Sequence, residues 1–341
     1  MNTPNWRMPI ETDPHERIYM AFPPLGELFG DTHEEALPAR TAWSAVANAT
    51  AQFLPVEMVV SPGDHDVARA MLSSEIRLHE APLNEAWMRD IGPTFVVSDD
   101  GRLGAVDWRF NGWGQQPSSW AHDEKIAAFI AELAGVELVP SDLVNEGGGI
   151  HVDGRGTVFL TDTVQLDRFR NPEWSRVQIE HELTRTIGAR NFIWFHRGLY
   201  RDALPGATRG HIDILAVPSD DSTVLLHRQT DPSHPDFHLY EECRAVLDEA
   251  RTIDGEPWRV LDLPAPKRLR DEETWVDHSY VNHLVTNGAV IACTYADPND
   301  EVALAVLAEA YPGREIVGID ARNIFRYGGG IHCITQQLPR V

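Results

Sequence analysis

A cysteine near the end of the chain, Cys333, has the surroundings of a nucleophile. It follows three glycines and a histidine in the run YGGGIHC at residues 327–333. Glycines let the backbone turn tightly, so they could expose the sulfur beside groups that activate it. A single cysteine taken alone is more often structural, and that alternative stays open. The other two cysteines, Cys243 in a helical pattern and Cys293 in an apolar run, are expected to be inert core thiols.

Residues 210–218, with the sequence GHIDILAVP, combine a histidine and an acid in an apolar setting. The alternation predicts a strand that places His211 and Asp213 on one face. Burying such groups is costly unless they are hydrogen-bonded, paired or used by a ligand. The pair is therefore either a structural hydrogen bond or a general acid/base with a neighbouring carboxylate.

A second histidine and acid, His151 and Asp153, occur in the sequence EGGGIHVDGRGT at residues 146–157. Glu146 stands immediately before three glycines, which would let the backbone approach a ligand closely. This acid is either a solvated loop residue or part of a site. The two His-x-Asp pairs also leave open a metal-dependent hydrolase in which they are the ligands.

An aromatic, a basic and an acidic residue stand together in the sequence NEAWMRDIGPTFVV at residues 84–97. A Gly-Pro turn follows them and leads into an apolar run, so Asp90 is expected at the edge of an element. Asp90 is a candidate site acid. The alternative is that Trp87 is a packing residue and that Arg89 and Asp90 belong to the charged surface.

Strands and helices alternate in the pattern of the chain, which predicts an α/β fold. Short β-branched runs predict strands at residues 56–62, 94–98, 157–161, 192–195, 223–227, 289–295 and 315–319. Amphipathic patterns predict helices at residues 122–135, 175–188 and 298–313. Ser175 is expected to cap the second helix, while Pro298 begins the third and Gly313 ends it.

The pentapeptide GGGIH occurs twice, at residues 147–151 and 328–332, which points to an internal repeat. Polar landmarks that recur about every 60 residues are Asp90, His151, His211, Asp277 with His278, and His332. A unit of about 60 residues that occurs five times fits this spacing better than two unlike domains. Such a repeat would gather equivalent loops around one axis, as propeller-like folds do.

The composition describes a folded and strongly acidic protein. Its 341 residues include 29 Lys and Arg and 52 Asp and Glu, a net charge of −23. This charge disfavours nucleic acid and anionic membranes as partners and favours a small cation. No run reaches the roughly 18 apolar residues of a membrane helix. Residues 1–17 lack the apolar core of a signal peptide, so we expect a cytoplasmic protein.

From about residue 15 to its end, the chain resembles the agmatine deiminase family, which is related to the peptidylarginine deiminases. The segments that carry the resemblance are 87-WMRDIGPTFVV-97, 146-EGGGIHVDGRGTVFLTD-162, 171-NP-172, 197-RG-198, 210-GHID-213, 279-SYVN-282, 297-DPNDE-301 and 328-GGGIHCITQQ-337. The resemblance implies a pentein fold, an α/β propeller of five ββαβ modules around a pseudo-fivefold axis. It also implies one catalytic domain over residues 1–341.

Roles for individual residues follow from the same resemblance. It implies that Cys333 is the nucleophile and His211 the general acid/base, and that Asp90 and Asp213 hold the guanidinium group. Glu146 would be a further acid. Trp87 would form a wall of the pocket, and Gly330 and Arg209 would also lie beside the substrate.

The resemblance also implies an activity, in which the chain hydrolyses the C–N bond of a linear amidine. Agmatine and water would give N-carbamoylputrescine and ammonia through an S-linked intermediate, a step in putrescine synthesis. No metal or organic cofactor is needed for this chemistry. The substrate would be the main partner, and the chain could form a homo-oligomer. We expect the Cys333 thiol to stay protonated until the cationic substrate binds, because nearby carboxylates disfavour a thiolate.

Several positions depart from the family pattern. Ile214 follows the GHxD element where the family usually has Asn, and Gly330 takes an Asn position. Arg209 and Arg326 add positive charge near the inferred site, and arginine is suited to binding a carboxylate. Free arginine or another guanidino acid is therefore an alternative substrate, unless these arginines face solvent or pair with surface acids. A non-catalytic guanidine-binding protein is a further alternative.

Overall fold

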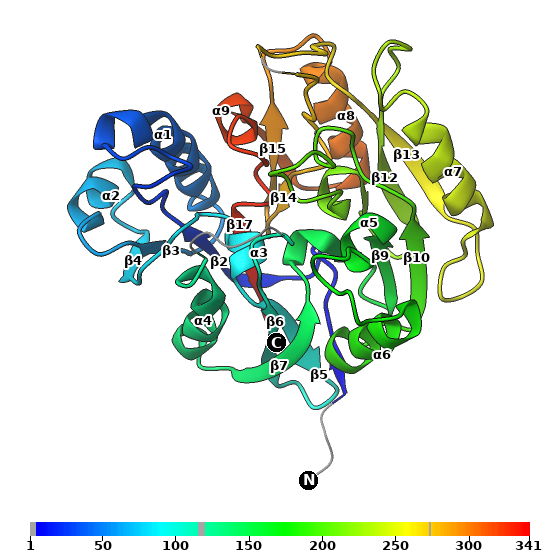
Figure 1. Cartoon of the computed structure of the whole chain (residues 1–341), viewed down its shortest axis with the longest axis horizontal. Helices are drawn as coiled ribbons and strands as arrows, with labels where there is room; N and C mark the ends of the chain where they lie inside the picture. The colour runs from blue at the N-terminus through cyan, green and yellow to red at the C-terminus, as the bar shows by residue number, and fades with distance from the viewer. Residues whose placement is uncertain (1–4, 115–119, 273) are drawn as a thin grey trace.

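The computed structural model describes residues 5–114, 120–272 and 274–341. Within these residues the strands form five small, open sheets of three or four strands each, so the predicted α/β class is confirmed (Figure 1). The longer helices lie around the outside of the view in Figure 1. No helix in the described part of the chain is long and apolar enough to span a membrane.

Four of the sheets repeat one pattern, in which two antiparallel strands are followed by a helix and a parallel third strand. The first has β5 (Thr94–Ser98), β6 (Leu103–Arg109), α4 (Ile126–Ala134) and β7 (Glu137–Val144), with β1 (Trp6–Arg7) beside β5. The others are β8 (Ile150–Val152), β9 (Thr157–Thr161), α6 (Arg176–Ile187) and β10 (Asn191–Phe195); β11 (Ala216–Pro218), β12 (Thr223–Arg228), α7 (Leu239–Glu249) and β13 (Arg259–Pro264); and β14 (Leu284–Val285), β15 (Ala289–Thr294), α8 (Asp300–Ala310) and β16 (Glu315–Asp320).

The fifth sheet is built from both ends of the chain. Its elements are β17 (Thr335–Pro339), β2 (His15–Ala21), α1 (His33–Thr50), β3 (Val56–Val60), α2 (His65–Met71) and β4 (Arg77–Glu80). The last strand, β17, pairs antiparallel with β2, so the two strands lie side by side in Figure 1. This pairing carries Cys333, two residues before β17, into contact with the N-terminal part of the chain.

Short helical turns lie in the connections around the sheets; Asp90 lies in one of them and His211 immediately precedes another. These turns are α3 (Met88–Ile91), α5 (Asp162–Gln165), α9 (Arg322–Phe325) and the 3₁₀ turns η1 (Asp123–Lys125), η2 (Gly147–Gly149) and η3 (Ile212–Ile214). The turn α3 contacts η2, and η2 contacts η3. Residues from three separate sheet connections therefore meet at one place.

Every predicted strand run contains an observed strand, but the strand predicted over residues 210–218 is wrong in its first half. His211 and Asp213 lie at the 3₁₀ turn η3, and only Ala216–Pro218 pair as strand β11. The N–H groups of Gly210 and His211 both donate to Oδ2 of Asp202, at 2.8 Å, in place of a sheet ladder. A side-chain acceptor has therefore replaced the strand partner that alternation implied.

Two of the predicted helix boundaries are informative. Ser175 caps α6 with a reciprocal bond to Gln178, and Gly188 ends it in the left-handed conformation, as its sequence predicts. The third helix is shorter than predicted. It begins at Asp300, after Asn299, and ends at Ala310, so Gly313 lies beyond its end.

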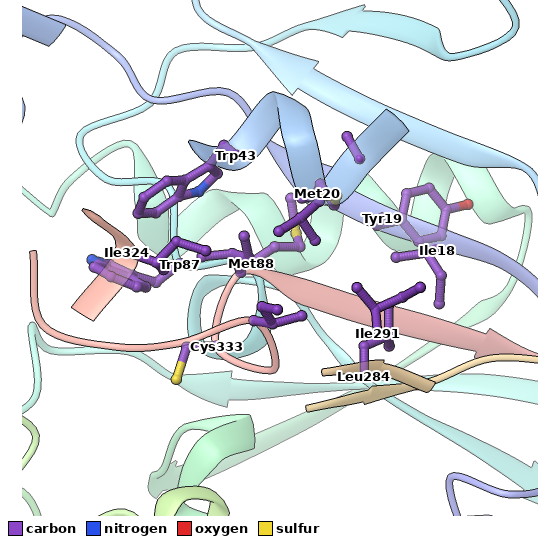
Figure 2. Packing of buried hydrophobic residues seen from close by; sticks show 14 of the residues in the cluster. Ile18, Tyr19, Met20, Trp43, Trp87, Met88, Leu284, Ile291, Ile324 and Cys333 are labelled. Atoms are coloured by element: carbon purple, nitrogen blue, oxygen red, sulfur yellow. The ribbon is translucent and has the colours of Figure 1, made fainter. Parts of the chain in front are cut away.

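A buried hydrophobic cluster supports the backbone around Cys333. It joins Ile18 and Met20 of β2 to Trp43 of α1 and to Trp87 and Met88 at α3. Figure 2 shows these side chains packed together, while the sulfur of Cys333 points away from them. The ring centroids of Trp43 and Trp87 are 5.3 Å apart, edge to face. Aromatic packing of this kind fixes one side of the nucleophile's surroundings.

Candidate active site

The sulfur of Cys333 lies between an acid and an amide. The thiol can donate to Oδ2 of Asp213 at 3.5 Å, and Nδ2 of Asn282 lies 3.2 Å from the sulfur. Burial raises the pKa of the Cys333 thiol well above its ordinary value, and the charges of Asp213 and Asp90 raise it further. The expectation that this thiol is protonated without substrate agrees with these surroundings.

Asn282 is a residue of this group that the sequence pattern did not single out. Its Oδ1 accepts the backbone N–H of His332 at 2.9 Å, and its Nδ2 also reaches the carbonyl oxygen of Asp213 at 3.3 Å. One buried side chain thus ties together the backbones that carry the nucleophile and the acid. Gly330 fits beside it because a Cβ there would lie 2.4 Å from the Oδ1 of Asn282.

His211 is buried between two carboxylates. Its Nε2 lies 3.2 Å from Oε2 of Glu146, and its Nδ1 lies 3.9 Å from Oδ2 of Asp90. Burial opposes the charged imidazolium, but Asp90, Glu146 and Asp213 outweigh it and raise the pKa of His211 to about 9. His211 is therefore an imidazolium at neutral pH, and its Nδ1 has no hydrogen-bond partner among the described residues.

Asp90 is held on both of its oxygens. Its Oδ1 accepts the backbone N–H of Gly148 at 3.0 Å, and its Oδ2 accepts the indole N–H of Trp113 at 2.9 Å. Burial raises the pKa of Asp90, as do the negative charges of Glu146 and Asp213. Asp90 and Arg89 are both buried, so the surface-charge alternative for this pair is wrong.

Three of these side chains converge on one glycine. A Cβ at Gly148 would lie 2.4 Å from Nδ1 of His211, 3.1 Å from Oδ2 of Asp213 and 3.1 Å from Oδ1 of Asp90. Only a residue without a side chain fits there. The triple glycine after Glu146 therefore permits the close approach of polar groups that its sequence suggested.

Within the described part of the chain, one carboxylate oxygen of Asp213 is hydrogen-bonded and the other is not. Its Oδ2 accepts from Nδ1 of His332 at 2.7 Å, while its Oδ1 is buried and has no partner among the described residues. Burial raises the pKa of Asp213, but His332 and His211 outweigh it and lower the pKa below its ordinary value. The free oxygen of an ionised carboxylate is suited to accept a guanidinium N–H.

Glu146 is fully buried, so the solvated-loop alternative for it is wrong. Nε of Arg170 lies 3.0 and 3.1 Å from its two oxygens, and Nε2 of His211 donates a further bond to Oε2. Burial would raise the pKa of Glu146, but Arg170 and His211 lower it to about 2. Arg170, which the sequence pattern missed, thus keeps this acid ionised and fixes it behind His211.

A cavity of about 620 Å³ opens onto Cys333 and Asp90. Trp87 and Trp113 form part of its wall. Its charged lining residues are Glu27, Glu85, Asp90, Asp123, Asp277, Arg201 and Arg326. Acids outnumber bases in this wall, so the cavity favours a cationic guest small enough to fit within it.

The sequence and fold match known proteins along nearly the whole chain. Residues 7–339 match the family model of the Porphyromonas-type peptidyl-arginine deiminases. The chain belongs to this family. It is 48% identical over 337 residues to a Streptomyces coelicolor protein provisionally named an agmatine deiminase, covering 98% of this chain and 99% of that one.

Two further relatives agree with this membership. The chain is 36% identical over 358 residues to the agmatine deiminase of Pseudomonas aeruginosa, covering 98% of this chain and 95% of the relative. The solved structure of an Enterococcus faecalis agmatine deiminase superposes with a TM-score of 0.92 at 31% identity, over 98% of this chain and 96% of that one. The α/β fold of this family member is therefore the fold of a solved deiminase.

The two arginines that depart from the expected deiminase pattern have different surroundings. Arg209 has a positive φ of 74°. Its Nε lies 3.2 Å from Oδ2 of Asp167, and its guanidinium lies over the ring of Phe169. Arg326 is exposed, lines the cavity and forms no ion pair with any described residue. Of the two, only Arg326 is placed to meet a substrate carboxylate.

The two His-x-Asp pairs do not form one metal-ligand set in this deiminase-family chain. Oδ1 of Asp153 accepts the N–H groups of Arg155 and Thr157 and so closes a turn. Among the described residues, the side chains that come close enough for a shared ion are Glu11, His151 and His332. The guanidinium of Arg89 lies 3.2 Å from Oε1 of Glu11 and already supplies a positive charge there.

Proposed function

We propose that this chain hydrolyses agmatine to N-carbamoylputrescine and ammonia through a covalent intermediate on Cys333. The observation that carries the proposal is the convergence of His211, Asp90 and Asp213 on Gly148. The sulfur of Cys333 lies beside Asp213, and Cys333 and Asp90 line an acidic cavity. The relatives that are named agmatine deiminases support this choice of substrate.

The two aspartates bind the guanidinium group. The free Oδ1 of Asp213 accepts one N–H, and Asp90, whose two oxygens are held by Trp113 and the backbone of Gly148, lies beside the same glycine. Paired carboxylates hold a planar guanidinium by parallel hydrogen bonds, which orients its central carbon. The indole of Trp87 forms the neighbouring wall. These contacts place the carbon within reach of the sulfur.

Substrate binding activates the nucleophile. The cation lowers the pKa of Cys333, which the carboxylates otherwise raise, and the thiol proton leaves to solvent. The thiolate attacks the guanidinium carbon and forms a C–S bond. The imidazolium of His211 then gives its proton to the departing nitrogen, the C–N bond breaks, and ammonia leaves.

The same histidine completes the reaction. Neutral His211 takes a proton from water, and the resulting hydroxide attacks the carbon of the S-linked intermediate. The C–S bond breaks with its electron pair on sulfur, and the hydroxyl proton passes to the thiolate. The ureido product leaves, with Cys333 protonated and His211 charged again. Glu146, held by Arg170, keeps the imidazole oriented in both half-reactions.

A guanidino acid such as free arginine is the second candidate substrate. The observation that favours it is Arg326, an exposed guanidinium on the cavity wall that forms no ion pair with the described residues. A bound carboxylate would pair with it. Arg209 gives less support, because Asp167 already neutralises it.

Ammonia release tests the proposal. The purified chain is incubated with agmatine, arginine and 4-guanidinobutyrate, with Cys333→Ala as the control. We expect kcat/KM to be highest for agmatine, by more than tenfold or about 1.4 kcal/mol. A higher kcat/KM for either acid would contradict the choice of agmatine. Release should persist in EDTA, because no step uses a metal, whereas loss of activity on chelation would favour the metal-hydrolase alternative.

Several finer expectations belong to the same proposal. We propose that the five ββαβ modules surround a pseudo-fivefold axis and that residues 1–341 act as one catalytic domain. The cytoplasmic location, the lack of nucleic-acid and membrane partners and a homo-oligomeric state stay predictions. So does the independence from organic cofactors.

A further inference from the structure

Two acids on the cavity wall, Glu85 and Asp123, have no part in the reaction described above. Asp123 is fully buried at the start of η1. Its Oδ1 accepts the backbone N–H groups of Asn84 and Glu85, at 2.9 and 3.3 Å. Its Oδ2 is buried without a hydrogen-bond partner among the described residues, and the same holds for Oε2 of Glu85.

In the described part of the chain, neither Glu85 nor Asp123 forms a salt bridge, whereas Asp90, Glu146 and Asp213 do. Burial raises the pKa of Glu85 to about 8, and the charges of Asp123 and Glu27 add to this effect, while the indole of Trp87 opposes it. Burial raises the pKa of Asp123 to about 6. Carboxyl oxygens that are buried without a partner are costly, so this pair indicates a binding site for a cationic group of a ligand.

The position of the pair relative to Cys333 suits the far end of a substrate. The Trp87 indole faces Glu85 on one side. On the other side it adjoins Gly329, where a Cβ would lie 2.8 Å from the indole and 3.1 Å from Sγ of Cys333. Trp87 therefore lies between Glu85 and the nucleophile, on the wall of one cavity that Asp123 also lines. A linear guest whose guanidinium lies at Cys333 would run along this ring.

We propose that Glu85 and Asp123 bind a primary ammonium group at the other end of the substrate and so select a guanidino amine over a guanidino acid. The inference rests on the proposed function and adds its specificity site. A substrate carboxylate would meet two acids here and be repelled. The ammonium offers three N–H donors, which match the two unpartnered oxygens.

The test compares agmatine with pentylguanidine, in which a methyl group replaces the ammonium. The ratio of their kcat/KM values isolates the ammonium contact, because the guanidinium and the methylene chain are common to both. We expect Glu85→Gln to lower this ratio at least tenfold. Asp123→Asn, which keeps an acceptor for the two backbone N–H groups, should lower it as well. Hydrolysis of pentylguanidine reports that each variant is folded.

Glu124→Gln is the matched control. Glu124 follows Asp123 in η1 but is exposed and does not line the cavity, so the same charge change there should leave the ratio within twofold of wild type. Ratios that stay unchanged in both Glu85→Gln and Asp123→Asn would overturn this inference alone. A wild-type chain that releases no ammonia from either compound would overturn the proposed function, and this inference with it.

Discussion

Nδ1 of His332 lies 2.7 Å from Oδ2 of Asp213, the same oxygen that faces the sulfur of Cys333. The residue immediately before the nucleophile thus holds the carboxylate that accompanies it. Nε2 of His332 lies 2.8 Å from Oε1 of Glu11, near the N-terminus. Burial and the charge of Arg89 oppose a charge on His332, but Glu11 and Asp213 outweigh them and raise its pKa, which favours the charged form between the two carboxylates.

Replacement of His332 should therefore act through Asp213. Because His332 lowers the pKa of Asp213, the ionised carboxylate persists to low pH, and His332→Ala should shift the acid limb of kcat/KM to higher pH. Loss of a charge-assisted hydrogen bond, about 1.5–3 kcal/mol, predicts a decrease in kcat/KM of about tenfold to a hundredfold. His283→Ala removes another buried histidine, with bonds to Tyr280 and Tyr311, and serves as the control. An acid limb that does not move would contradict this role.

Cys333 should be the essential and yet unreactive thiol of the free enzyme. Cys333→Ala should abolish ammonia release. Burial and the neighbouring acids raise its pKa, so the rate of alkylation by iodoacetamide should still rise with pH above about 8.5 when no ligand is present. A thiol pKa below 7 in that experiment would sink the idea of activation by substrate. Cys243 and Cys293, whose pKa values burial raises to about 12, should stay unlabelled in the folded chain.

The basic limb of the pH profile should report His211. Its pKa is raised to about 9, so the imidazolium that protonates the departing nitrogen is present at neutral pH and lost as pH rises through about 9. The ion pairs of His211 also stabilise the folded state. This contribution to the free energy of unfolding is complete below the pKa of an unfolded histidine, near 6.5, and is lost as pH rises through about 9. Measurement of kcat/KM from pH 6 to 10.5 checks this. A decrease in kcat/KM between pH 6 and 7 would show instead that His211 is already neutral at neutral pH.

Gly148→Ala should remove activity with little change in folding. The added Cβ would lie 2.4 Å from Nδ1 of His211, so the imidazole must move away from its position between Asp90 and Glu146. Misplacement of a catalytic group by about 1 Å costs on the order of a hundredfold in rate. At Gly288 the nearest atom to an added Cβ, Cδ1 of Phe53, is 3.4 Å away, so Gly288→Ala is the matched control and should keep full kcat/KM. Comparable activity in the two variants would be the contrary result.

Binding of agmatine should release a proton from Glu85. The groups that face this carboxyl are Asp123, Glu27 and the indole of Trp87, and its pKa of about 8 leaves it mostly protonated at pH 7. An ammonium guest favours the ionised form. Calorimetric titration of Cys333→Ser, in buffers that differ in ionisation enthalpy, separates this proton from that of the thiol. Combining Glu85→Gln with Cys333→Ser should abolish most of the proton release. Equal proton release in the single and the double variant would count against the ammonium site.

The candidate residues could be picked out from the sequence because they lie in short motifs, whereas the reaction assigned to them came from the family resemblance. Cys333 after three glycines, His211 two residues before Asp213, and Asp90 before a turn are visible without a structure. The seven strand runs were also predictable, since β-branched alternation is a local signal. The spacing of about 60 residues likewise matches the five sheets.

The partners of those residues depended on tertiary structure. No sequence pattern indicated the partners of four residues, because each partner is many residues away along the chain. These residues are Arg170, Asn282, Glu11 and His332, although Asn282 and His332 lie in segments that carry the family resemblance. The pairing of β17 with β2 places Cys333 beside residues near the N-terminus, and this contact is between segments over 300 residues apart. The strand predicted at His211 did not form because the N–H groups of Gly210 and His211 donate to the carboxylate of Asp202, which lies outside the predicted run. Types and order of reactive groups are local properties, whereas burial, protonation state and the match of acids to cations are set only when distant sheets meet.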